Sequence, residues 1–533
     1  MSVLAVLLLL AVVLTVVILI QRSTGPKDEP GDQGADLVAY LILAIAVGVA
    51  GFALASLAAT AFPGERFVFD PAEELANALS ALVVSAPFAI YFWRRQARRR
   101  QAHPESAGWT FYLSLIELVF MTAFVIAAVM FINGLLTDEP ASAWTGFVVF
   151  GAVLALHEYA AAKTPPSSEA GELQRVLGSA IALVTGAIGL AAVAVAILSE
   201  GYEALGGDSV AEGFHPWVAM LVVGAPIWWY RWLRPWRADP GMPRLTWTVF
   251  VSVISLTTVL ASLTAIVLVC LQYVFADTRP AGEHFEVVPI ALGLAIVGTP
   301  IWAVHRRALG EDAGDSTQVY RFAMAAIGLA TAVGTATFLT IIAIDRTLIV
   351  GAGASEVIGV ATALVAGLVV WLFFERKAGD ADRDRQSWPR RIYTLGLGVV
   401  FALIAAGALI ATIFVLLRRL LETGANGSLV EPISILAYTG LTAWYLLRAH
   451  QRSRERVEAT KAIAPFEVMV ICSHPGMIAT RFPKEAKLKV VYRADDAGPI
   501  DDTMAEEIVA AVANRPALVW VDEEGFRVAA KRQ

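Results

Sequence analysis

Charged residues are scarce in this sequence. Only 17% of its 533 residues are charged and 57% are hydrophobic, with a mean hydropathy of +0.65. A soluble globular chain carries about 25% charged residues. The charges stand in short clusters between apolar runs of about 18 to 30 residues, each long enough to cross the core of a bilayer. This composition argues against a soluble protein and predicts many membrane-spanning helices.

The sequence also lacks the motifs of common catalytic and metal sites. Its two cysteines are Cys270, in an apolar run, and Cys472, near the C-terminus, and no C-x-x-C pair occurs. This usage argues against a disulfide scaffold and against a zinc module. The phosphate-loop, zinc-protease and serine-hydrolase motifs are absent, and the seven histidines are scattered. We therefore predict no cofactor, no metal site and no enzymatic activity.

Lysine and arginine are nearly absent from alternate loops. The loops on one predicted side of the membrane carry 27 of these residues, and those on the other side carry only five. Basic loops remain in the cytoplasm during insertion, so the C-terminus is predicted to be cytoplasmic and the N-terminus outside. The first run, residues 3–20, lacks the basic start and the cleavage site of a signal peptide. It predicts a retained spanning helix.

Thirteen apolar runs predict spanning helices. A short motif recurs where alternate runs end: GAPIW at 224–228 matches GTPIW at 298–302. Looser copies begin at Ser85, Gly151, Gly367 and Gly440. Their spacing of 66 to 74 residues predicts parallel repeats, each with a long helix going out and a shorter one returning. The runs lie at 3–20, 37–60, 74–93, 109–136, 143–161, 174–199, 216–233, 245–275, 287–304, 318–346, 356–374, 391–420 and 430–448.

The predicted fold is mainly α-helical: a polytopic membrane protein with one N-terminal helix, six two-helix repeats and a small cytoplasmic α/β domain. The N-terminal helix and its linker take residues 1–36, the membrane domain 37–460 and the α/β domain 461–533. The six repeats are predicted at 37–108, 109–173, 174–244, 245–317, 318–390 and 391–460.

The repeat pattern joins a long Gly/Ala-rich helix to a shorter helix that ends in G-x-P-I-W and a basic run. It resembles a bacterial multi-spanning repeat family catalogued only as a domain of unknown function, over about residues 37–450. Three copies depart from the motif at the proline, with Val153, Val369 and Thr442 in its place. The resemblance implies the helical repeat fold in a bacterial cytoplasmic membrane, and it implies no activity.

Tryptophan and arginine gather where the returning helices end. Such residues stack on nucleic-acid bases in some proteins, but they also anchor helices at the membrane interface. Their recurrence at the ends of several spans favours the lipid bilayer as the partner and argues against nucleic acid. The predicted interface anchors are Trp228, Trp229, Arg231, Trp302, Trp371 and Trp444.

Few ionisable residues lie well inside the predicted spans. Glu117 stands on the first helix of the second repeat, and His157 and Glu158 stand on its second helix. Ionisable residues in the membrane are functional candidates by default. We predict that Glu117 and His157 pair across this hairpin, either as a polar site for a proton, ion or headgroup or as a structural pair near the interface.

The C-terminal domain offers two further candidate sites. Strands are predicted at 466–471, 488–492, 517–521 and 526–529, and a helix at 501–514. Cys472 and His474 follow the first strand, where α/β folds place ligands, and they form either a nucleophilic pair or no site at all. Asp495 and Asp496 form either a divalent-cation site or a solvated turn before the helix.

Three functions are compatible with these features. The favoured prediction is a non-enzymatic membrane scaffold or sensor whose cytoplasmic domain binds a protein partner or a small ligand. The first alternative is a channel or transporter, which would gain support if threonines of the long helices lined one cavity. The second is an enzyme, which would gain support if Cys472 and His474 faced a common pocket. The threonines in question are Thr257, Thr258, Thr264, Thr331 and Thr335.

Overall fold

The structure is a computed structural model. The predicted first span, 3–20, lies outside the residues that it describes. The chain forms two compact units, Met1–Glu375 and Arg376–Gln533, which are considered separately. The described residues are 30–60, 71–102, 106–137, 143–163, 168–203, 213–232, 242–276, 279–310, 315–348, 353–381, 387–421, 428–461, 467–472, 478, 487–492, 500–512, 517–522 and 525–530.

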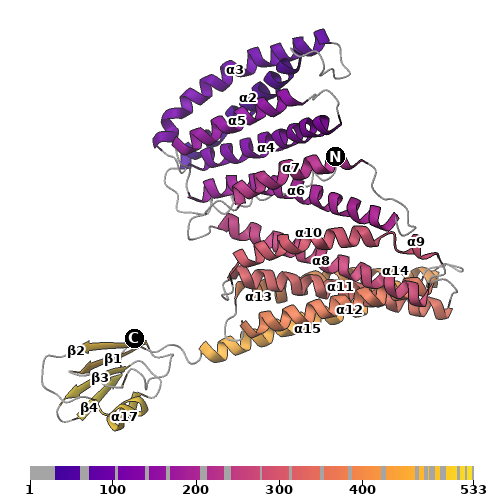
Figure 1. Cartoon of the computed structure of the whole chain (residues 1–533). Coiled ribbons are helices and arrows are strands. Elements are labelled where there is room, and N and C mark those ends of the chain that lie inside the picture. Colours follow the sequence, from indigo (N-terminus) through magenta and orange to yellow (C-terminus); the bar gives the residue numbers. More distant parts are fainter. Residues whose placement is uncertain are drawn as a thin grey trace. The chain divides into compact units, whose positions relative to one another are not determined.

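Long helices dominate the chain (Figure 1). Each predicted span between residues 37 and 448 coincides with helix, although many helices extend further at their polar ends. The first unit contains α2 (Pro30–Thr60), α3 (Pro71–Ala102), α4 (Ala107–Leu136), α5 (Trp144–Lys163), α6 (Ser168–Glu203), α7 (Phe214–Trp232), α8 (Met242–Phe275), α9 (Ala281–His284), α10 (Val288–Ala308), α11 (Asp315–Leu348) and most of α12 (Ala354–Ala381). The second unit contains α13 (Trp388–Arg391), the π-helical turn η1 (Ile392–Gly396), α14 (Leu397–Leu421) and α15 (Val430–Lys461).

Among the described residues, ten helices are long and apolar enough to cross a membrane. The chain is therefore an integral membrane protein. The predicted spans at 216–233 and 430–448 coincide with α7 and α15, which are not among the ten. Tryptophan, tyrosine and charged residues lower the mean hydropathy of these two segments. Their identification as spans therefore rests on their place in the repeat pattern.

Consecutive helices pair as hairpins. In the first unit α2 contacts α3, α4 contacts α5, α6 contacts α7 and α8 contacts α10, and α14 contacts α15 in the second unit. The first helix of each hairpin also contacts the first helix of the next, in the order α2, α4, α6, α8 and α11. The hairpins of the first unit are therefore joined in sequence order through their first helices. In the first hairpin the two helices are of nearly equal length, 31 and 32 residues, so the predicted difference in length is absent there.

Glycine allows two of the hairpins to pack with their backbones in contact. A methyl group at Gly224 on α7 would lie 2.6 Å from Cα of Gly186 on α6. One at Gly367 on α12 would lie 2.7 Å from the backbone nitrogen of Ala332 on α11. Small residues permit such approaches between membrane helices, where dispersion forces replace the hydrophobic effect as the source of association.

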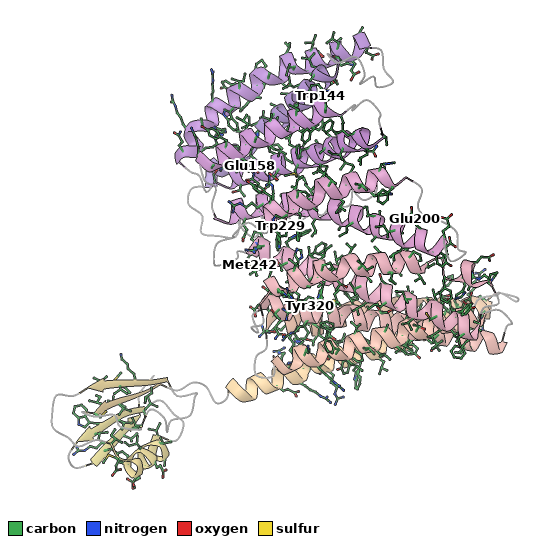
Figure 2. The ribbon with its side chains drawn as sticks, viewed as in Figure 1. Trp144, Glu158, Glu200, Trp229, Met242 and Tyr320 are labelled. Atoms are coloured by element: carbon green, nitrogen blue, oxygen red, sulfur yellow. The ribbon has the colours of Figure 1, made fainter. Side chains whose placement is uncertain are left out.

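Large apolar side chains cover the outer surfaces of the helices (Figure 2). Val83 is 71% exposed and Leu420 is 81% exposed. The interior near the start of α4 is aromatic instead, with Trp109, Tyr112 and Phe120 fully buried. Apolar surfaces of this kind suit lipid, while the buried aromatic groups hold the first two hairpins together.

The C-terminal region of the second unit is a four-stranded mixed sheet with strand order β2-β1-β3-β4. The first three strands are parallel, and β4 is antiparallel to β3. Helix α17 packs against one face through Ala505, Ile508 and Val512, and the Asp501 carboxylate caps its start by accepting from the Met504 N–H over 2.8 Å. The predicted strands and helix are confirmed to within a few residues. Their bounds are β1 (Glu467–Cys472), β2 (Lys487–Tyr492), α17 (Asp502–Val512), β3 (Ala517–Asp522) and β4 (Gly525–Ala530).

Candidate intramembrane polar site

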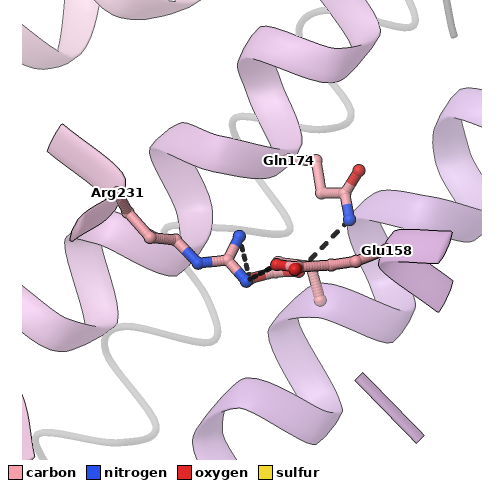
Figure 3. A network of polar contacts seen from close by, with 4 residues as sticks. Glu158, Gln174 and Arg231 are labelled. Carbon is pink, nitrogen blue, oxygen red and sulfur yellow. Dashed lines mark hydrogen bonds and ion pairs between the residues drawn. The ribbon is translucent and has the colours of Figure 1, made fainter. Parts of the chain in front are cut away.

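Four polar side chains from four helices meet inside the membrane region (Figure 3). Glu117 comes from α4, Glu158 from α5, Gln174 from α6 and Arg231 from α7. Glu117 lies ten residues into its helix, about 15 Å along the axis at 1.5 Å per residue. The cluster therefore joins the second hairpin to the third.

The Arg231 guanidinium holds two carboxylates at once. Its Nη1 lies 2.9 Å from Oε1 of Glu117, and its Nη2 lies 2.5 Å from Oε1 of Glu158. Gln174 donates from Nε2 to the other oxygen of Glu117 over 3.3 Å. The exposed fractions of the side chains are 1% for Glu117, 8% for Arg231 and 44% for Glu158. The first carboxylate is thus sequestered, and the second remains accessible at the surface of the protein.

A glycine on the neighbouring helix leaves the room that the Glu117 side chain occupies. A methyl group at Gly178 on α6 would overlap Oε1 of Glu117 and would lie 3.2 Å from Cδ and Nη1 of Arg231. Burying two charges is costly, and their attraction repays that cost only when the geometry is close and further hydrogen bonds are made. The absence of a side chain at Gly178 permits this close geometry.

The predicted pair between Glu117 and His157 is wrong. The structure gives the two side chains different partners: Glu117 pairs with Arg231, and Nε2 of His157 lies 2.6 Å from the Tyr112 hydroxyl. Nδ1 of His157 lies 2.7 Å from the carbonyl oxygen of Val153. A carbonyl only accepts, so Nδ1 carries the proton and Nε2 of the neutral ring accepts from the phenol. The imidazole is therefore part of an aromatic cluster rather than of the ionic one.

Sequence reasoning missed the roles of Gln174 and Arg231. Arg231 was expected to be an interface anchor, yet its side chain is buried. The sequence did contain a feature that relates Arg231 to Glu158. Each stands seven residues after the glycine of its motif copy, Gly224 and Gly151. Opposite charges at equivalent positions of neighbouring repeats are able to pair when those repeats pack side by side. Gln174 offered no comparable signal.

The predicted tryptophan anchors have different surroundings. Trp229 and Trp444 are 65% and 55% exposed, as side chains in contact with lipid would be. Trp302 donates from its indole nitrogen to the Tyr320 hydroxyl over 3.0 Å. The Trp228 ring stacks on His305 of α10, and the backbone of Trp371 lies against Gly328 of α11.

The candidate sites of the C-terminal region divide between described and undescribed residues. His474, Asp495 and Asp496 lie outside the described residues. Cys472 ends β1 with its side chain in the core of the domain, where it is 1% exposed, and burial raises the pKa of its thiol. Elsewhere in the described chain, no group of three or more His, Cys, Asp and Glu residues is placed to hold a metal ion.

Cys472 is expected to resist alkylation in the folded protein. Because the thiolate is the nucleophile, a raised pKa lowers the reactive fraction at neutral pH and moves the rise of the rate to higher pH than in the unfolded chain. The measurement is maleimide labelling from pH 6.5 to 9.5 in a Cys270→Ser background, with and without denaturant. Equal rates in the folded and unfolded chains would contradict the buried position.

Comparison with known proteins adds a family match. The model of a family described as a domain of unknown function (DUF5671) matches residues 36–156 and 318–454, together just under half of the chain. The first segment takes in α2 to α4 and most of α5, and the second takes in most of α11 and continues into α15. No curated protein and no solved structure matches this chain.

Proposed function

We propose that this chain is a non-enzymatic scaffold or sensor of the bacterial cytoplasmic membrane, in which a membrane domain of helical repeats is followed by a partner-binding cytoplasmic domain. In this proposal thirteen helices span the membrane, the N-terminus lies outside, and six hairpins repeat in one orientation. The excess of basic residues in alternate loops supports the orientation. The contacts between the first helices of successive hairpins and the two segments matched by one family model support the repeats.

The observation that carries the proposal is the ion pair between Glu117 and Arg231. Oε1 of the buried carboxylate forms an ion pair with the guanidinium, and Oε2 accepts a hydrogen bond from Gln174. A carboxylate that carried a proton or an ion across the membrane would need a free oxygen and access to water. The engaged carboxylate instead supports a structural clamp between two hairpins.

The threonines of the long helices support a scaffold rather than a channel. The hydroxyls of Thr258, Thr264 and Thr331 donate to the carbonyl oxygen four residues earlier on their own helices, as does that of Thr335. The Thr257 hydroxyl lies 3.9 Å from the Met324 sulfur. Because these hydroxyls already have hydrogen-bond partners in the protein, they need no water in a cavity as a partner.

Flux measurements on the full chain separate the scaffold from the transporter. The purified protein is reconstituted into liposomes loaded with a pH-sensitive or cation-sensitive dye, and the wild type is compared with Glu117→Gln. A scaffold is expected to give no flux above that of protein-free vesicles. Flux that the wild type produces and Glu117→Gln abolishes would replace the proposal with the transporter alternative.

The partner-binding part of the proposal has its own test. The full chain is extracted in mild detergent, and molecules that remain bound in stoichiometric amounts are identified for the wild type, His474→Ala and the double variant Asp495→Asn/Asp496→Asn. A scaffold or sensor is expected to retain the same molecule in repeated preparations, and changes at its contact surface should release it. A chain that retains nothing in cells where it is functional would contradict this part.

A further inference from the structure

Arg100 is a buried cation at the basic end of α3. The residue is 6% exposed, and its guanidinium carbon lies 3.9 Å from the ring centroid of Trp93 and 5.1 Å from that of Trp109. Within the described chain its one hydrogen bond is a long contact of 3.5 Å to the carbonyl oxygen of Trp93. A guanidinium carries five N–H donors, so most of this donor capacity is unused.

Two other buried donors lie beside Arg100. The indole N–H of Trp109 has no hydrogen-bond partner among the described groups, and the hydroxyl of Tyr40 has only a loose contact with the Ser106 side chain. Their rings are neighbours, with centroids 6.0 Å apart, and both residues are at most 1% exposed. Buried polar groups without partners are costly. Donors gathered around an unneutralised cation therefore call for an anionic acceptor.

The depth of these residues is that of lipid headgroups. The apolar span of α3 ends at Arg98, that of α4 begins at Gly108, and that of α2 begins at Leu37. Arg100 thus stands just beyond the end of one span, while Trp109 and Tyr40 stand just inside the starts of two others. Basic pockets between helices at this level suit the phosphate groups of anionic lipids.

Arg231 provides a contrast within the same protein. It is buried to a similar degree, but two carboxylates of the chain neutralise it. Arg100 has no such carboxylate among the residues that the structure describes. A buried arginine without an internal counter-ion is stabilised by one from outside the chain.

We propose that Arg100, Trp109 and Tyr40 form a binding site for a phosphate group, supplied by an anionic lipid headgroup or by free phosphate. The guanidinium provides the charge and a fork of N–H groups that matches phosphate oxygens. The indole N–H and the phenol hydroxyl add two neutral donors. The site lies between the first two hairpins and is independent of the scaffold proposed above.

Lipid binding to the full chain tests the site. The protein is purified in a neutral detergent, and affinities for phosphatidylglycerol and phosphatidylcholine are measured in mixed micelles, with retained lipid counted by native mass spectrometry. Arg100→Gln is expected to weaken phosphatidylglycerol binding by about tenfold or more, because charge-assisted hydrogen bonds are lost. The matched controls Arg95→Gln and Arg98→Gln remove an exposed arginine from the same helix end, and they are expected to change it by about twofold or less.

Two conservative variants keep the test decisive if Arg100→Gln does not fold. Arg100→Lys retains the charge but loses the fork, and Trp109→Phe retains a ring but loses the N–H donor. Each is expected to weaken binding by several-fold, with phosphatidylcholine binding unchanged. The proposal is overturned if folded Arg100→Gln binds as the wild type does, if both conservative variants bind as the wild type does, or if the Arg98→Gln control loses as much affinity as the Arg100 variants.

A second arm distinguishes the source of the phosphate group. Inorganic phosphate is titrated against the lipid-free protein, and the melting temperature is followed for the wild type and Arg100→Lys. Stabilisation by phosphate that depends on Arg100 assigns the site to the phosphate group itself. Stabilisation by phosphatidylglycerol alone assigns it to a lipid headgroup held in place by its acyl chains.

Discussion

Replacing Arg231 with glutamine is expected to lower the free energy of unfolding by about 3–5 kcal/mol, the range for removing one partner of a buried ion pair. Glu117 would then remain in a site where it is 1% exposed, with only the Gln174 amide as a partner. Glu117→Gln is expected to cost less, about 1–2 kcal/mol, because Arg231 keeps its contact with Glu158. Unfolding titrations in mixed micelles, with thermal denaturation as a second measurement, give both values.

Two further variants establish that the effect comes from the pair. The double variant Glu117→Gln/Arg231→Gln is expected to be more stable than Arg231→Gln alone, because it no longer buries an unpaired carboxylate. Glu158→Gln removes a carboxylate that is 44% exposed and is expected to cost less than about 1 kcal/mol. Equal stability of Arg231→Gln and Glu158→Gln would mean that the clamp does not form.

The positions of the helices were predictable from the sequence because a helix that crosses the bilayer core needs a long apolar run of its own. The ends were less predictable. Helix α3 runs to Ala102, well beyond the expected end at residue 93, because its final turns contain arginine, glutamine and alanine, which favour helix once the chain has left the lipid. Hydropathy marks where a span leaves the apolar core, and helix propensity decides how far the helix continues.

The partners inside the membrane were not predictable in the same way. Glu117 and His157 stand at similar depths in one hairpin, yet each helix rotates its side chain toward a different neighbour. Glu117 faces the third hairpin, and His157 faces the aromatic cluster around Tyr112. Depth follows from sequence position, whereas the rotation of a helix depends on packing between segments far apart in the chain. The repeat alignment was the one sequence feature that related Arg231 to Glu158.

The C-terminal region was predicted more fully because local signals coincide there. Alternating apolar residues predict strands with one buried face, and Val468 and Val470 are fully buried as this pattern requires. The Asp501 cap and the stripe that includes Ile508 and Val512 predict the helix. The position of Cys472 follows from the same pattern. The alternation that places Val470 in the core also places Cys472 there, which argues against its prediction as an accessible nucleophile.

Gly224→Ala is expected to destabilise the third hairpin by about 1–3 kcal/mol, the range for overpacking a close contact. The added methyl group would lie 2.6 Å from Cα of Gly186 and 2.8 Å from the carbonyl oxygen of Ala182. These are backbone atoms, so no side-chain rotation relieves the contact, and α6 and α7 must move apart. Gly224→Val is expected to cost more, and the same unfolding titration measures both variants.

The equivalent glycine of the sixth repeat provides the matched control. A methyl group at Gly440 would lie 3.9 Å from Cβ of Ala405, an ordinary van der Waals distance. Alanine also favours helix over glycine by up to about 1 kcal/mol. Gly440→Ala is therefore expected to be neutral or stabilising, as is Gly334→Ala on α11, where no atom lies within 4 Å. The same substitution should thus lower the free energy of unfolding at one copy of the motif and not at the other. A loss of stability at Gly440 equal to that at Gly224 would show that the motif glycine is needed for backbone conformation rather than for close packing between helices.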